Sequence, residues 1–252
     1  MAGHSKWANI RHKKAAVDKK RGRMWSKCSR AIMAAAREGG GDPASNLALR
    51  YAIDEARYAN MPKDTIERAV KKGAGELGGG KMESVRYEGY GPNGVAIIAD
   101  ALTDNRNRTA PEVKMVFSKY NGNMGASGSV AYSFDTVGQI LVEAGKTTED
   151  VVINAAIDAG ATDVEAPEDD DGFWVVSTEP TQFHAVREAL ENAKIEISSA
   201  EIALIPQNTV AVAGDDAKKV LTLIDALEEL EDVQKVYSNA DISEEDYAAF
   251  DS

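Results

Sequence analysis

The chain has 252 residues, of which 43% are hydrophobic and 28% charged, and its formal net charge is −12. These values are typical of a globular protein, and the length allows one large domain or two to three smaller ones. The longest run of apolar residues, 31–36, is far shorter than the roughly 20 that a membrane-spanning helix needs, and no apolar signal-peptide region follows the basic start.

Charge is divided unevenly along the chain. Residues 1–72 carry 17 basic and 7 acidic side chains, whereas residues 73–252 carry 12 basic and 34 acidic ones. This division predicts separate modules with separate partners. The basic start has the composition of a mitochondrial transit peptide, but residues 3–7 are not amphipathic, so we prefer a cytoplasmic location.

The first module is predicted to be a bundle of three helices. Apolar residues at helical spacing indicate a helix over Met24–Arg37, which the glycines at 39–41 end. Asp42 and Pro43 are predicted to begin the second helix, as N-cap and first helical residue. Pro62 opens the third, and a glycine-rich linker follows it. We therefore expect a basic helical domain and linker over residues 1–80.

The alternation of apolar and polar residues then indicates strands. Ser84–Tyr90 and Val95–Leu102 form a predicted hairpin around the turn Gly91-Pro92-Asn93-Gly94. Thr109 to Glu112 has the pattern of a capping box, which predicts a helix beginning there and reaching about Tyr120.

Two further α/β domains are expected after the linker. Strands at 129–134 and 139–143, followed by alternating helices and strands, give residues 131–205 the order β-β-α-β-β-α-β, close to a ferredoxin-like unit. The flanking residues 81–130 and 206–252 would form one discontinuous α/β domain around it. The predicted fold class is α+β with three domains: an N-terminal three-helix bundle and two α/β (ferredoxin-like) domains, one inserted in the other.

Catalytic and metal-binding patterns are not found in the sequence. One cysteine and three dispersed histidines show no metal-ligand spacing, and we predict no catalytic residue, no metal and no cofactor. Cys28 lies on the predicted apolar stripe and is expected in the core, with a reactive thiolate beside basic neighbours as the alternative. The acidic run 168–171 fits a solvated turn better than a calcium loop.

The basic start predicts nucleic-acid binding. Residues 1–30 contain ten Lys or Arg and one Asp, whereas solvated helix faces normally mix both signs. Cationic side chains neutralise phosphates and aromatic rings stack on bases, while the broad apolar face needed for a membrane surface is missing. The predicted nucleic-acid-binding residues are Lys6, Trp7, Arg11, His12, Lys13, Lys14, Lys19, Lys20, Arg21, Arg23, Lys27 and Arg30.

A secondary anion site is suggested by Arg106 and Arg108, which lie next to the predicted helix start. The alternative is a polar turn whose Asn and Asp side chains bond the local backbone. The acidic part of the chain would be repelled by phosphate, so nucleic acid should contact one end only. The acidic domains would then be free for a protein partner.

Several stretches together resemble the YebC/PmpR family over nearly the whole chain. One departure is Asn121-Gly122, where the family usually has Gly-Gly, so the geometry of that loop is open. The stretches that carry the resemblance are MAGHSKWANIRHKK (1–14), GGGDP (39–43), YEGYGPNG (87–94), LTDNRNRT (102–109) and GSVAYSF (128–134).

The resemblance implies a cytoplasmic protein with a helical bundle and two α/β domains, one inserted in the other. Family members are described as DNA-binding transcriptional regulators. A related mitochondrial group activates translation of cytochrome c oxidase subunit I, and bacterial members are linked to ribosomes and to difficult proline-rich sequences. We therefore expect a DNA-binding transcriptional regulator, not an enzyme. The alternative is a ribosome-associated translation factor that binds ribosomal RNA.

Overall fold

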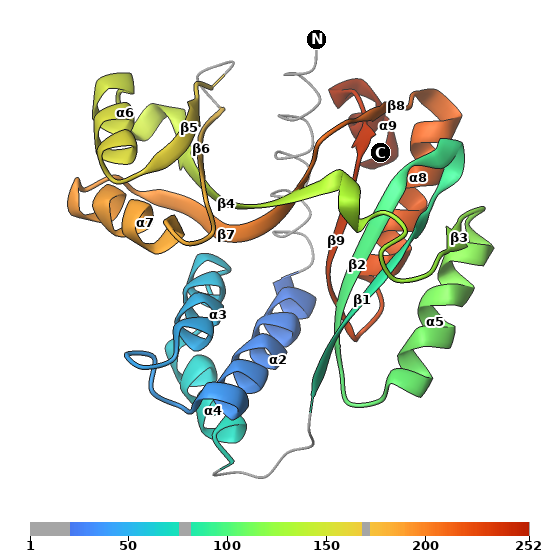
Figure 1. The fold of residues 1–252 in the computed structure, drawn as a ribbon, viewed down its shortest axis with the longest axis horizontal. Coiled ribbons are helices and arrows are strands. Elements are labelled where there is room, and N and C mark those ends of the chain that lie inside the picture. Colours follow the sequence, from blue (N-terminus) through green and yellow to red (C-terminus); the bar gives the residue numbers. More distant parts are fainter. Residues whose placement is uncertain (1–20, 76–81, 168–171, 252) are drawn as a thin grey trace. The chain divides into compact units, whose positions relative to one another are not determined.

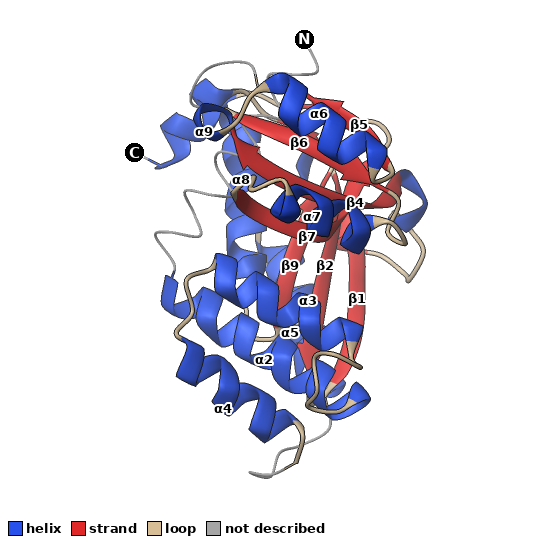
Figure 2. Ribbon diagram, turned by 90° about the vertical axis from the view of Figure 1, so that its left-hand side faces the viewer, coloured by secondary structure: helices blue, strands red, loops and turns tan. Residues whose placement is uncertain are grey.

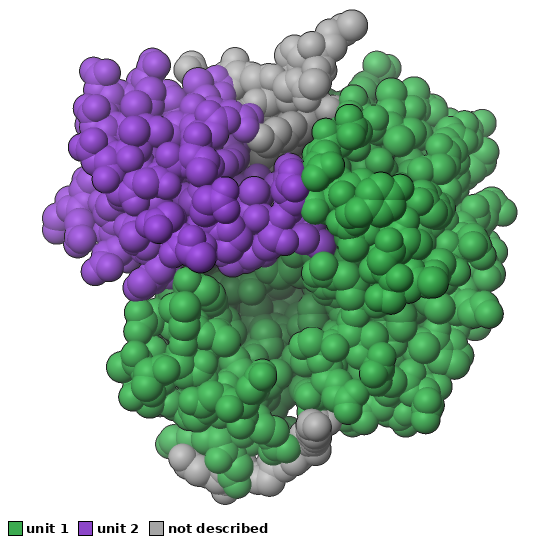
Figure 3. All heavy atoms as spheres, viewed as in Figure 1, with its two compact units in different colours: residues 1–134, 206–252 green, residues 135–205 purple. Residues whose placement is uncertain are grey.

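The structure is a computed structural model that describes residues 21–75, 82–167 and 172–251. The chain divides into two compact units, residues 1–134 together with 206–252 as unit 1 and residues 135–205 as unit 2 (Figures 1 and 3). Both units combine helices with antiparallel sheet, so the fold is α+β, as predicted.

The first part of unit 1 is a bundle of α2 (Arg21–Gly39), α3 (Leu47–Tyr58) and α4 (Lys63–Gly73). Cys28 and Ile32 of α2 pack in one buried cluster with Leu49 of α3 and with α4. A Cβ atom on Gly73 would lie 2.5 Å from the carbonyl oxygen of Met33, so only glycine allows α4 to approach α2 this closely. The predicted three helices and the core position of Cys28 are confirmed.

The second helix begins later than predicted, at Leu47 and not at Asp42. The Asn46 side chain accepts a hydrogen bond from the Leu49 amide (3.0 Å) and donates to the carbonyls of Ala35 and Gly40 (2.8 Å each). Asn46 thus caps α3 and ties it to the preceding helix. Asp42 accepts from the Ala44 amide instead and stabilises a separate turn.

The second part of unit 1 is a four-stranded sheet in the order β3-β1-β2-β9. The predicted hairpin is confirmed: β1 (Glu83–Tyr90) and β2 (Ala96–Thr103) pair antiparallel around a turn in which Asn93 has φ +58°. The remaining strands are the short β3 (Asn123–Met124) and β9 (Val233–Ser238). A separate parallel pair is formed by β8 (Val210–Ala211) and β10 (Ala240–Asp241), and α9 (Glu244–Asp251) follows.

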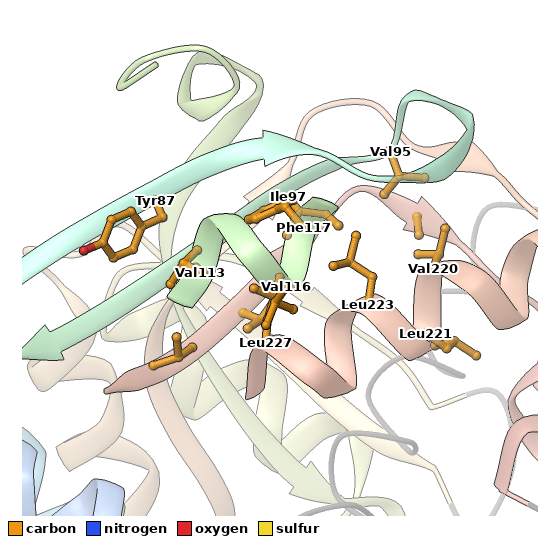
Figure 4. Close-up of a cluster of buried hydrophobic side chains, with 14 of the residues drawn as sticks. Tyr87, Val95, Ile97, Val113, Val116, Phe117, Val220, Leu221, Leu223 and Leu227 are labelled. Carbon is orange, nitrogen blue, oxygen red and sulfur yellow. The ribbon is translucent and has the colours of Figure 1, made fainter. Parts of the chain in front are cut away.

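The helices α5 (Arg106–Lys119) and α8 (Gly214–Glu228) supply apolar side chains to the main core of unit 1. Figure 4 shows Phe117 of α5 and Leu223 of α8 directed toward Ile97 of β2, and all three are fully buried. This core contains residues that precede unit 2 in the sequence and residues that follow it. Residues 82–134 and 206–251 therefore form one folded body.

The predicted capping box at Thr109 is wrong. Helix α5 begins at Arg106, and Asn105 is its N-cap, accepting from the Arg108 amide at 3.2 Å. Thr109 is fully buried inside the helix, where its hydroxyl contacts Asp232 at 2.6 Å. The hydroxyl therefore serves a tertiary contact and does not cap the helix.

Unit 2 is built from β4 (Phe134–Glu143), α6 (Glu149–Asp158), β5 (Ala161–Glu165), β6 (Phe173–Thr178), α7 (Phe183–Asn192) and β7 (Ile197–Pro206). Its sheet has the order β5-β6-β4-β7, and α6 and α7 lie side by side on it (Figure 2). The β-α-β-β-α-β sequence with this strand order is ferredoxin-like. The strand predicted at 129–134 is wrong, because residues 131–133 form a 3-10 turn, and the strand predicted at 139–143 begins earlier, at Phe134. The acidic run 168–171 lies outside the described residues.

Candidate nucleic-acid interface

The predicted nucleic-acid-binding residues fall into two groups. Arg21 and Arg23 lie in the first turn of α2, and Lys27 and Arg30 follow on the same helix. The eight that lie outside the described residues are Lys6, Trp7, Arg11, His12, Lys13, Lys14, Lys19 and Lys20.

Lys27 and Arg30 already have partners within unit 1. The Lys27 ammonium donates to the carbonyl oxygen of Glu228 at 3.0 Å, close to the end of α8. Arg30 lies one helical turn further on and donates to Asp232 at 2.6 Å and also to Glu231. A phosphate would have to compete with the carbonyl that binds Lys27 and with the carboxylates that bind Arg30, so the assignment of both residues to nucleic acid stays a prediction.

Asp232 is the centre of this contact, and the sequence argument did not find it. Its carboxylate is 3% exposed and accepts from Arg30 and, at 2.8 Å, from Arg108. The hydroxyls of Thr103 and Thr109 lie 3.1 and 2.6 Å from the same carboxylate. Burial alone would raise the pKa of Asp232, but the hydrogen bonds from Thr109, Arg108, Arg30 and Thr103 outweigh it and lower the pKa to about 2.

The stretch TDNRNRT (103–109) therefore has a structural role. It provides the N-cap of α5 and three of the four side chains that hold Asp232. Arg108 also pairs with Asp104 at 3.0 Å, and Arg106 lies 4.0 Å from Glu83. These contacts match the alternative of a polar turn, while the secondary anion site at Arg106 and Arg108 stays a prediction.

Two further side chains of α2 belong to the bundle. Trp25 donates from its indole nitrogen to the carbonyl of Ala59 at 3.0 Å and packs against the bundle core. Burial raises the pKa of the Cys28 thiol to about 12, and the nearby Glu55 carboxylate adds to the shift. The structure thus places Trp25 in a packing role and makes Cys28 a core thiol.

Lys71 and Lys72 are exposed at the end of α4 and form no ion pair with any described residue. Other cations of the bundle have acidic neighbours: Arg57 pairs with Asp54 and Arg68 with Asp64, both at 3.1 Å. Lys71 and Lys72 are therefore exposed cations without an acidic partner among the described residues.

Glu88 binds the backbone of the stretch GSVAYSF (128–134), which is one of the stretches that carry the family resemblance. Its carboxylate, 3% exposed, accepts from the backbone amides of Gly128 (2.7 Å), Val130 (2.9 Å) and Ala131 (2.8 Å). Burial opposes ionisation, but these three amides outweigh it and lower the pKa of Glu88. Glu88 of the stretch YEGYGPNG therefore holds in place the loop formed by the stretch GSVAYSF.

Metal-binding and membrane-spanning features are not seen in the described part of the chain. No group of His, Cys, Asp and Glu side chains there is arranged to hold a metal ion. None of the helices of residues 21–75, 82–167 and 172–251 has the length and apolar character needed to cross a membrane.

Two family profiles together match almost the whole chain. One, described as the TACO1/YebC protein N-terminal domain, matches residues 5–76, and the other, described as the TACO1/YebC second and third domain, matches residues 82–240. The chain belongs to the TACO1/YebC family. The boundary between the two profiles coincides with the segment between the helical bundle and β1.

Relatives of this TACO1/YebC chain are similar over their full length. A probable transcriptional regulatory protein of Burkholderia ambifaria is 54% identical over 97% of this chain and 100% of the relative. One of Natranaerobius thermophilus is 52% identical over 97% and 98%. The crystal structure of a conserved hypothetical protein from Aquifex aeolicus matches with a TM-score of 0.82 and 47% identity, covering 94% of this chain and 97% of that one. The names of the Burkholderia and Natranaerobius relatives describe probable transcriptional regulatory proteins.

Proposed function

We propose that this TACO1/YebC protein is a nucleic-acid-binding regulator of transcription that holds the phosphate backbone of DNA with its basic N-terminal segment. The observation that carries the proposal is the charge of residues 1–30, ten Lys or Arg against one Asp, in a chain of net charge −12. The names of the relatives support the regulatory role. The proposal assigns no catalytic residue and no cofactor.

The physical basis is counterion release. Each Lys or Arg that neutralises a phosphate releases condensed counterions, so binding strengthens as salt is lowered. Residues 73–252, with 34 acidic against 12 basic side chains, are repelled by the same phosphates. Repulsion confines the main contact to the N-terminal end and leaves the acidic domains for a protein partner. The single buried Cys28 suits the reducing cytoplasm, where we place this activity.

The contacts of α2 favour phosphate binding by the basic residues that precede Lys27. Lys27 and Arg30 are engaged with the end of α8 and with Asp232. The phosphate contacts are therefore assigned first to Lys6, Arg11, Lys13, Lys14, Lys19, Lys20, Arg21 and Arg23, with Trp7 and His12 beside them.

A second candidate is a ribosome-associated translation factor that uses the same residues on ribosomal RNA. The observation that favours it is the orientation of α2, whose Lys27 binds a backbone carbonyl at the end of α8 and whose Arg30 binds the Asp232 carboxylate. A helix that reads base edges needs its polar side chains free for the groove. Contacts to phosphates alone position a protein without selecting a sequence.

The contact between the N-terminal basic residues and phosphates is tested by measuring how binding to labelled duplex DNA and to single-stranded RNA depends on salt concentration. Replacing Lys13, Lys14, Lys19 and Lys20 by Ala should reduce the log–log salt slope by about 3.6 on duplex or about 2.8 on a single strand, if each contacts one phosphate. The matched control replaces the same four lysines by Arg, which keeps the charge and should keep the slope. An alanine variant with undiminished affinity would overturn the N-terminal assignment.

The target is tested separately. A footprint on promoter DNA at physiological salt, absent from scrambled DNA, would support the transcription regulator and overturn the translation factor. Two other results would support the translation factor and overturn the transcription regulator. They are salt-sensitive co-sedimentation with ribosomes and codon-specific pausing in ribosome profiles of cells that lack the protein.

A further inference from the structure

Polar contacts join the helical bundle to the α/β part of unit 1. Lys27 and Arg30 of α2 are bound by residues 228–232, at the end of α8 and in the turn after it. On α3, the Glu55 carboxylate pairs with the ammonium of Lys235 in β9 at 2.9 Å. The apolar core of the bundle and that of the α/β part have no residue in common. We call the contacts of Lys27, Arg30 and Glu55 the polar interface.

The groups at the polar interface are accessible to water and to ions. The side chains of Lys235 and Glu55 are 30% and 36% exposed, and that of Glu231 is 83% exposed. Ion pairs with this exposure contribute little to stability and are screened by salt. The Lys27 ammonium binds a backbone carbonyl, which water can satisfy in its place. Opening this interface therefore costs far less than unfolding either part.

Asp232 does not depend on Arg30 alone. Its carboxylate also accepts from Arg108 at 2.8 Å and from the hydroxyls of Thr103 and Thr109 at 3.1 and 2.6 Å. A buried carboxylate that loses its last cation is strongly destabilised, but this one keeps an arginine and two hydroxyls. Arg30 can therefore leave and return without stranding a buried charge.

We propose that the polar interface is a switch, which holds the bundle on the α/β part in the free chain and opens when the phosphates of nucleic acid take Lys27 and Arg30. This inference rests on the proposed nucleic-acid binding and deepens it. The Arg30 side chain is only 16% exposed, so it becomes fully available to a phosphate backbone when the bundle separates from residues 228–232. In the sequence, glycines at 75 and 78–80 lie between the bundle and β1, and glycine-rich linkers let the parts they join separate.

Opening and binding are thermodynamically linked. If nucleic acid binds the open form, the closed population weakens the apparent affinity, and a change that weakens the interface strengthens binding. Glu55→Gln removes the carboxylate partner of Lys235 and should tighten binding about threefold. The matched control is Glu67→Gln, which removes the same charge from an exposed position of α4 and should tighten binding less.

Opening itself is measured by energy transfer between two fluorophores on the full chain. They are attached at Ala48→Cys on α3 and Ser118→Cys on α5, both exposed positions, in a Cys28→Ala background. Adding duplex DNA or single-stranded RNA should lower the transfer efficiency, because the bundle moves away from the α/β part. The affinity measurements need no label and therefore check this result independently.

A double variant tests which cations hold the interface. Lys27→Gln/Arg30→Gln should show low transfer efficiency in the free chain and little further change when nucleic acid is added, because the interface is already open. Its salt slope on duplex DNA should also be smaller, by about 1.8 if each side chain contacts one phosphate. Lys71→Gln/Lys72→Gln removes the same charge from exposed positions of the bundle and should leave the transfer efficiency of the free chain unchanged.

The outcomes separate the switch from the proposed function. If the unaltered chain binds neither duplex nor single strand, the proposed function fails and the switch with it. If the chain binds while the transfer efficiency stays constant, only the switch is overturned. Equal affinities of Glu55→Gln and Glu67→Gln would overturn it as well. So would an unaltered transfer efficiency in free Lys27→Gln/Arg30→Gln, because other contacts would then hold the bundle.

Two arms without nucleic acid complete the test. At 1 M salt the screening length is about 3 Å, so the transfer efficiency of the free chain should fall. A transfer efficiency that does not depend on salt would overturn a polar switch. Inorganic phosphate, exchanged for chloride at constant ionic strength, should have no effect of its own. Opening by inorganic phosphate alone would assign the switch to a small anion and overturn nucleic acid as its ligand.

Discussion

Arg30 donates a hydrogen bond of 2.6 Å to the buried carboxylate of Asp232, joining residues 202 positions apart in the sequence. This contact connects the helical bundle to the α/β part of unit 1 and occupies a cation that the sequence had assigned to nucleic acid. Because the same carboxylate also holds Arg108, Thr103 and Thr109, it fixes the start of α5 at the same time.

Replacing Asp232 by Asn should lower the free energy of unfolding by about 2–3 kcal/mol, because two arginines then face a neutral amide. Urea titration measures the change. The matched control is Glu231→Gln, which removes the other carboxylate partner of Arg30. The Glu231 side chain is 83% exposed, and its loss should change the stability by less than about 1 kcal/mol. Equal effects of the two substitutions would contradict the central role of Asp232.

The contribution of Asp232 should depend on pH. Its pKa is about 2 in the folded chain against an ordinary 3.8, so its stabilising effect is complete above 3.8 and is lost as the pH falls toward 2. The stability difference between the unaltered chain and Asp232→Asn should therefore shrink by about 2 kcal/mol between pH 5 and pH 2. Urea titrations of both proteins across this range measure it, since other carboxylates cancel in the difference. A constant difference would show that the carboxylate is not specially stabilised.

Glu88→Gln should loosen the loop at residues 128–131. A glutamine places an NH₂ group against backbone amides that now donate to a carboxylate, so at least one hydrogen bond is lost. Hydrogen exchange of the amides of Gly128, Val130 and Ala131 should become about tenfold faster. Glu83→Gln, on the same strand but exposed, is the control and should leave these amides unchanged. Unaltered exchange in Glu88→Gln would contradict the role of Glu88.

Cys28 should resist alkylation in the native protein at neutral pH. A pKa of about 12 leaves the thiol protonated, and 4% exposure restricts access of the reagent. Mass spectrometry after iodoacetamide treatment should find Cys28 unmodified in the native chain and fully modified in urea. Rapid modification without denaturant would instead support the alternative of a reactive thiolate.

Asn121 should tolerate glycine but not alanine. Its φ of +60° is open to glycine and to asparagine, but costs a residue with an ordinary Cβ about 1 kcal/mol. Asn121→Ala should lower the midpoint of thermal unfolding, whereas Asn121→Gly should not. Equal midpoints for the two variants would contradict a strained backbone here. This left-handed conformation explains how asparagine is accommodated where related sequences are expected to have glycine.

Features that depend on neighbours in the sequence were predicted well. Apolar residues at helical spacing located all three helices of the bundle, and the Gly-Pro-Asn-Gly turn located the β1–β2 hairpin. Helix starts were predicted less well, because several capping residues compete locally. Asn46 caps α3 in place of Asp42 because its amide also reaches Ala35 and Gly40. Thr109 does not cap α5 because its hydroxyl contacts Asp232.

The sequence by itself determined the separation of a basic N-terminal part from an acidic remainder and the α+β order of elements, because charge and periodicity are local properties. Only the tertiary structure decided which cations have acidic partners. Arg30 and Arg108 meet at Asp232, and Lys235 meets Glu55, because strand order and helix packing bring together residues that are far apart in the chain.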